Sequence, residues 1–247
     1  MLIVPRAARV ACWLNGWLAR RESADAVISG VIGADAAVEF AGLTPGVRLS
    51  PALLLGELRR QGASRVTASL PTPGDPIGLG GPALFNADAL DVGEAIVAHG
   101  PDIGFVPRPS GGLTVWMASA VTPPTFLPDI PTADRELRAA VTQAAADLGS
   151  LDVASWSPDA ADALLNLRAP ATLDAWLPFP TPRAAQLAVT SLRCQRIVEL
   201  ALRDEGGSLS ATVANRRRTA LQPLARAARA GLVAATSSLD GDQAPPL

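Results

Sequence analysis

Two aspartates and the single histidine, Asp75, His99 and Asp102, are the first residues whose chemistry could serve catalysis. A carboxylate beside an imidazole can act as an acid/base pair or supply part of a metal site. Both aspartates, however, fall at expected turns, where Asp accepts backbone hydrogen bonds, and one histidine gives zinc or iron too few nitrogen ligands. The sequence therefore argues against an enzyme and against a metal site. An active site formed by these three residues stays an alternative hypothesis, which requires their side chains to converge.

A segment rich in proline and glycine spans residues 71–86. Its residues 78–83 match the letters of a dinucleotide-binding turn, G-x-G-x-x-G/A. Such a turn leaves a strand directly and presents free N–H groups to a pyrophosphate, and Pro82 removes one of those donors. We therefore predict no nucleotide and no other cofactor, and interpret the segment as a rigid interaction loop. The residues expected to make its contacts are Gly78, Gly80, Gly81 and Phe85.

A basic face is expected on the last helix, where Arg226 and Arg229 follow a run of three arginines. The run consists of Arg216, Arg217 and Arg218. Acidic residues lie nearby and no aromatic residue is interleaved to stack on bases, so nucleic-acid binding is only the second alternative. All 21 basic residues are arginine and tyrosine is absent, a bias typical of GC-rich genomes. This bias makes each arginine weaker evidence for phosphate recognition.

The overall composition is that of a packed globular protein. The 247 residues are 49% hydrophobic and 18% charged, with a net charge of −2, so no global field favours nucleic acid or an anionic membrane. Cys12 and Cys194 fall within helical patterns and are expected to be buried free thiols. The apolar runs do not fit a signal peptide or a membrane span, so we expect a cytoplasmic protein without membrane contact.

Apolar spacing divides the first half of the chain into helices and strands. The predicted helices cover residues 5–21, 24–32, 35–40, 51–61 and 87–92. The predicted strands cover residues 65–70, 94–99, 103–106 and 113–121. Hairpin-length turns join the later strands, which indicates a small antiparallel sheet over about residues 64–121.

A proline-rich connector follows the sheet and marks the expected boundary between a first part, residues 1–125, and a second part, residues 126–238. The predicted helices of the second part cover residues 133–148, 157–168, 183–205 and 211–236. A short Gly-Gly joint makes the last two an antiparallel αα-hairpin. The two parts are expected to pack as one unit, and residues 239–247 are expected to form a loose tail.

Residues 71–86 and 204–210 resemble stretches of an uncharacterised family of proteins from high-GC Gram-positive bacteria. The similarity covers most of the chain, and its motifs are specific to that family. The resemblance implies a bacterial origin, in agreement with the arginine bias. It implies no activity, cofactor or catalytic residue.

The sequence thus predicts an α+β protein, in which the antiparallel sheet packs with helices from both flanks and an αα-hairpin closes the chain. The leading functional hypothesis is a non-catalytic cytosolic module that binds a protein partner or a second copy of itself, through the loop or the hairpin. Three tryptophans near proline-rich connectors, Trp116, Trp156 and Trp176, could be its exposed anchors. The alternative is a small-ligand-binding protein or an enzyme with a pocket near residues 71–86.

Overall fold

The computed structural model describes residues 1–150, 173, 175–203 and 211–239. Within this part of the chain, six strands form one sheet in the order β2-β1-β6-β5-β4-β3. The strands are β1 (Ala37–Ala41), β2 (Arg48–Leu49), β3 (Arg65–Ser69), β4 (Ala95–His99), β5 (Ile103–Ser110) and β6 (Leu113–Ala120). Neighbouring strands are antiparallel except β1 and β6, which are parallel. The predicted α+β class is confirmed.

The sheet is larger than predicted because β1 and β2 also belong to it. A helix near residues 35–40 was expected, and this prediction is wrong: Ala37–Ala41 is a strand whose Val38 and Phe40 are buried on one face. A stretch of five residues is too short for its apolar spacing to distinguish a helix from a strand. The stretch is a strand because it pairs with β6, which is distant in sequence: Ala37 pairs with Leu113.

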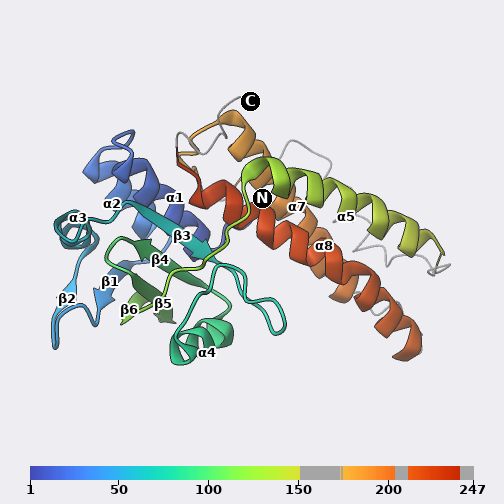
Figure 1. The fold of residues 1–247 in the computed structure, drawn as a ribbon, viewed down its shortest axis with the longest axis horizontal. Helices are drawn as coiled ribbons and strands as arrows, with labels where there is room; N and C mark the ends of the chain where they lie inside the picture. The colour runs from blue at the N-terminus through green and yellow to red at the C-terminus, as the bar shows by residue number, and fades with distance from the viewer. Residues whose placement is uncertain (151–172, 174, 204–210, 240–247) are drawn as a thin grey trace.

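Helices cover both faces of the sheet (Figure 1). On one face, α1 (Arg6–Leu18), α2 (Ala24–Ile32) and α3 (Pro51–Arg60) share a large core with buried side chains of β1, β3, β4, β5 and β6. On the other face, α4 (Ala83–Val92) forms a smaller core with alternate residues of β4 and β5. This division follows from the period-two alternation of side chains along a strand.

Three long helices follow the connector and lie side by side (Figure 1). They are α5 (Ile130–Ser150), α7 (Pro182–Arg203) and α8 (Ala211–Ser237). Near one end of the pair α7 and α8, the Arg217 guanidinium donates to the Ala201 carbonyl at 3.3 Å. Near the other end, a Cβ built on Gly231 would collide with Ser191. The two helices are therefore antiparallel, as predicted, and α5 packs on α8 as a third member. The predicted helix 157–168 and almost all of the predicted tail lie outside the described residues.

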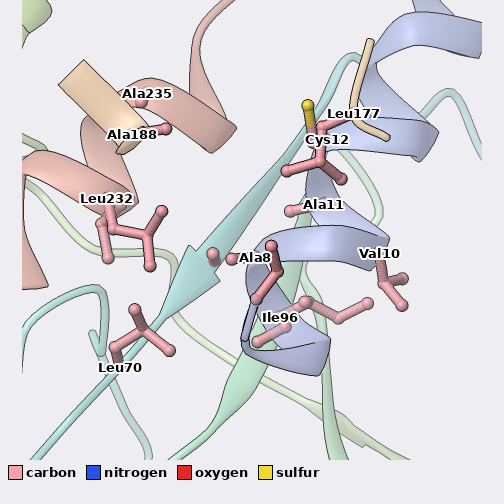
Figure 2. Packing of buried hydrophobic residues seen from close by; sticks show 14 of the residues in the cluster. Ala8, Val10, Ala11, Cys12, Leu70, Ile96, Leu177, Ala188, Leu232 and Ala235 are labelled. Atoms are coloured by element: carbon pink, nitrogen blue, oxygen red, sulfur yellow. The ribbon is translucent and has the colours of Figure 1, made fainter. Parts of the chain in front are cut away.

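The long helices share the main core with the sheet. Figure 2 shows Leu232 and Ala235 of α8 in the same cluster of buried residues as Ala8 and Ala11 of α1 and Ile96 of β4. Burial of this apolar surface stabilises the fold at about 25 cal/mol per Å² removed from water. Among the C-terminal helices, α8 makes contacts with both α1 and β3.

Among the described residues no strand lies beside the outer edge of β3, and two polar side chains bind to this edge instead. Asn15 of α1 accepts a hydrogen bond from the Val66 N–H at 2.8 Å and donates to the Val66 carbonyl at 2.7 Å. Ser237 at the end of α8 accepts from the Ala68 N–H at 3.0 Å. Asn15 also donates to the Thr236 carbonyl at 3.2 Å, so one side chain joins α1, β3 and α8. The edge is thereby satisfied and closed to further strand pairing.

Candidate functional site

A cleft of about 730 Å³ lies between the proline- and glycine-rich segment and the long helices. Residues 75–79 and the connector residues 124–128 form one wall, and α5 and α8 form the other. Its apolar lining includes Ile77, Leu79, Phe126, Pro223 and Ala227. The volume lies within the range of roughly 300–1,000 Å³ that small-molecule pockets occupy. We call this feature the interdomain cleft.

Asp75 is a charged residue of the interdomain cleft and is held from both sides. Its backbone closes a tight turn with Thr72, through hydrogen bonds of 3.0 and 2.8 Å. Its carboxylate accepts a hydrogen bond from Nη2 of Arg229 at 2.7 Å and lies 3.4 Å from Nε of Arg226. The side chains of Asp75 and Arg229 are only 12% and 19% exposed, whereas Arg226 is 72% exposed. Asp75 was predicted at a turn and is found there, but its charge pairs with a helix distant in sequence.

His99 and Asp102 lie away from the interdomain cleft. His99 pairs with Arg65 at the start of β3, whereas Asp75 follows the other end of that strand. Nε2 of His99 lies 3.0 Å from Oγ1 of Thr67, and the Asp102 carboxylate accepts from the Gly100 N–H at 3.3 Å. The structure therefore brings His99 near Asp102 at one end of the sheet and leaves Asp75 at the other. The convergence that the enzyme alternative required does not occur.

Partial burial lowers the pKa of His99 below its ordinary value of 6.5. Loss of solvation is the largest cause, the charge of Arg65 acts in the same direction, and Asp102 opposes them. The unfolded chain then binds the proton more readily than the folded chain. Stability that depends on neutral His99 is thus present above pH 6.5 and is lost as the pH falls through the lowered pKa.

We expect His99→Gln to reduce the loss of stability between about pH 8 and pH 5, because glutamine keeps a partner for Thr67 but does not titrate. Urea unfolding of both proteins across this range measures the effect. Buried Glu94 acts in the opposite direction, because desolvation raises its pKa above 4.5. The comparison with wild type isolates His99, since Glu94 is common to both proteins. Parallel stability curves would contradict the assignment.

Gly78 and Gly80 of the loop lie close against the rest of the chain, whereas a Cβ on Gly81 would meet nothing within 4 Å. A Cβ on Gly78 would lie 2.7 Å from the Ala68 carbonyl, and one on Gly80 would collide with Thr122 and Pro123. The Gly81 carbonyl accepts a hydrogen bond from the Thr122 N–H at 3.0 Å. Gly78 and Gly80 let the loop approach β3 and the connector closely.

Phe85 and Trp116, two of the predicted contact residues, are not where an interaction surface would need them. Phe85 is buried in the core beneath α4, so it is not an exposed anchor. Trp116 is also buried, and its ring stacks on Phe40 with the centroids 6.2 Å apart. Trp176 is 66% exposed, and Trp156 lies outside the described residues. Proximity to a proline-rich connector in the sequence thus did not predict which tryptophan is exposed.

The arginine run does not form one continuous cationic face. Arg216 and Arg218 are exposed, but Arg217 is buried and donates to the carbonyl of Ala201 in α7. Successive residues of an α-helix point about 100° apart, so three in a row cannot share one face. Arg217 is therefore not part of the surface that the second alternative, nucleic-acid binding, requires.

The thiols offer no nucleophile near neutral pH. Cys12 and Cys194 are buried and free, as predicted, and burial raises their pKa values to about 12 and about 11. Across the described ranges, no group of three or more His, Cys, Asp or Glu side chains is placed to hold a metal ion. Every helix in the same ranges is too short or too polar to span a bilayer.

The fold and the cleft together define a protein with an N-terminal α+β part and a C-terminal helical part. Residues 7–129 match the N-terminal domain of Rv1486c-like proteins, and residues 131–233 match their C-terminal domain. The chain therefore belongs to the Rv1486c-like family. The family name follows mycobacterial usage, which is consistent with the resemblance to proteins of high-GC Gram-positive bacteria. No curated protein and no solved structure matches the chain.

The two family domains meet at residue 130, next to the connector that lines the cleft. Asp75 and Phe126 belong to the N-terminal domain, whereas Glu136, Arg226 and Ala227 belong to the C-terminal domain. The sequence indicated a pocket near residues 71–86 but not its second wall. α8 contributes Pro223, Arg226, Ala227 and Ala230 to that second wall.

Proposed function

We propose that the protein binds a small organic molecule in the interdomain cleft. The observation that carries this proposal is a cleft of about 730 Å³ with apolar walls from both domains and a charged cluster, Asp75 with Arg226 and Arg229. Ligand sites are frequent between domains, where apolar walls supply affinity and a few polar groups fix the orientation. Two guanidinium groups engage Asp75, so its carboxylate is unsuited to act as a general base. Binding rather than catalysis is the better supported function.

We expect Ala140→Trp to abolish binding, because this half-buried residue of α5 lines the cleft and an indole there would fill it. Ala139→Trp is the matched control, since Ala139 is exposed and does not line the cleft. Mass spectrometry of small molecules released from each purified protein measures retention. The expected result is a compound that accompanies wild type and Ala139→Trp and falls at least about tenfold in Ala140→Trp. Equal retention by all three proteins, or no released compound from any of them, would overturn the proposal.

A second candidate is self-association through an exposed apolar surface around Trp176. The Trp176 side chain is 66% exposed and meets Trp13 edge to face at 5.2 Å, and Ile3 beside the same hollow is 77% exposed. A rigid exposed tryptophan is a frequent anchor of protein interfaces. Light scattering should then give a molar mass above the 25.4 kDa of one chain, and Trp176→Ala should lower it. The control is Leu84→Ala, which removes an exposed side chain from α4. A mass of one chain for wild type at every concentration would exclude this candidate.

A further inference from the structure

We propose that the ligand of the interdomain cleft is an amphipathic anion, whose carboxylate or phosphate binds the Arg226 guanidinium while its apolar body lies against the cleft walls. This inference rests on the proposed ligand-binding function and specifies the class of ligand.

The charges around Asp75 do not cancel. Two guanidinium groups, from Arg226 and Arg229, share this single carboxylate, so the three groups together carry a formal charge of +1. Arg229 holds Asp75 firmly at 2.7 Å, and its own Nε is buried without a hydrogen-bond partner among the described residues. The cluster thus contains more donors than the carboxylate satisfies, which favours a second anion.

Asp75 engages only part of the Arg226 guanidinium. Its Nε faces Asp75 at 3.4 Å, and in the described part of the chain no other acidic group pairs with its guanidinium. Its side chain is 72% exposed and lines the cleft. A guanidinium can offer two parallel N–H groups to one carboxylate or phosphate. Asp75 therefore orients Arg226 from one side and leaves the terminal nitrogens for a ligand on the other.

Apolar side chains line the same cleft as this donor group. Ile77 and Leu79 come from the loop, and Phe126 from the connector is 75% exposed. A ligand that covers this exposed phenylalanine gains binding free energy, since each Å² of apolar surface removed from water contributes about 25 cal/mol. A ligand with an apolar body can cover this side chain and still place its charged group at Arg226. The walls and the cation together select an amphipathic molecule.

Glu136 sets a limit on this arrangement and supplies a control. It is exposed on α5 and lines the wall that α5 and α8 form, so its negative charge opposes a bound anion. No described carboxylate other than Asp75 pairs with Arg226, so Glu136 weakens the site without filling it. Removal of this charge is therefore expected to strengthen anion binding, in contrast to removal of Arg226.

The test uses three probes with the same tail: decanoate, decyl phosphate and decanol. Calorimetric titration into the full chain should show that one or both anions bind at least about tenfold more tightly than decanol. Arg226→Met should lower anion affinity by about tenfold and leave decanol unchanged. Glu136→Gln should raise anion affinity by about twofold, as expected for one distant, solvent-screened charge. Comparison of the two anions shows whether a carboxylate or a phosphate is preferred.

The failure of this inference is distinguishable from that of the proposed function. Equal binding of decanol and both anions, or full anion affinity in Arg226→Met, would overturn anion recognition even if Ala140→Trp blocked all three probes. Failure of all three probes to bind would also overturn it, and the compound released from wild type would still test whether the cleft binds a ligand. Arg226 is mostly exposed, so its replacement should leave the fold intact, and circular dichroism checks this.

Discussion

Replacement of Asn15 by alanine is expected to lower the free energy of unfolding by roughly 3–5 kcal/mol. The change removes an amide that pairs with both the N–H and the carbonyl of Val66 and also donates to Thr236. All three contacts are buried, and each buried backbone group left without a partner costs about 1–3 kcal/mol. A small cavity adds to the loss. Urea unfolding followed by circular dichroism measures the difference.

A matched variant separates this edge contact from the general effect of losing an asparagine. Asn215 is exposed on α8, so Asn215→Ala is expected to change stability by less than about 0.5 kcal/mol. Ser237→Ala removes only the partner of the Ala68 N–H and should have an intermediate effect. If Asn15→Ala were as stable as Asn215→Ala, the side chain would not be what satisfies the edge of β3.

Asn15 also illustrates which features a single sequence can predict. The strands within residues 65–120 and the helix starts at residues 24 and 51, which Ser23 and Ser50 directly precede, were predicted because their signals are local. Both serines indeed accept hydrogen bonds from backbone N–H groups three residues later, at 3.2 and 3.4 Å. Asn15, by contrast, interrupts an apolar stripe, and only the assembled sheet shows that its partner is the edge of β3.

The candidate site was predictable on one side only, for the same reason. Asp75 was assigned to a turn from its proline and glycine neighbours, and the turn is present. Its charged partner Arg229 is 154 positions away, and no local pattern connects the two. The arginine bias of the sequence also hid Arg229, because it looked like one of many solvated cations on a helix face. Which residues of the two domains pair with each other depends on the tertiary fold, and apolar spacing does not determine that fold.

Replacement of Arg229 by methionine is expected to lower the free energy of unfolding by about 3–5 kcal/mol. Methionine preserves much of the side-chain volume but leaves the nearly buried Asp75 with only the exposed Arg226 as a partner. A buried carboxylate that loses its close cation destabilises the folded state, since water cannot replace the lost interaction. Arg216→Met on the same helix is the control, because Arg216 is exposed and should tolerate the change within about 0.5 kcal/mol.

A double-mutant cycle tests whether the pair itself causes this loss. Asp75→Leu combined with Arg229→Met removes both charges, and we expect it to be more stable than Arg229→Met alone by at least about 2 kcal/mol. Urea unfolding of the four proteins gives the coupling energy. Additive losses would show that Arg229 acts through packing alone. A strong coupling would mean that the N-terminal domain holds α8 by a charge pair beside the cleft, so that a bound anion meets a preorganised Arg226.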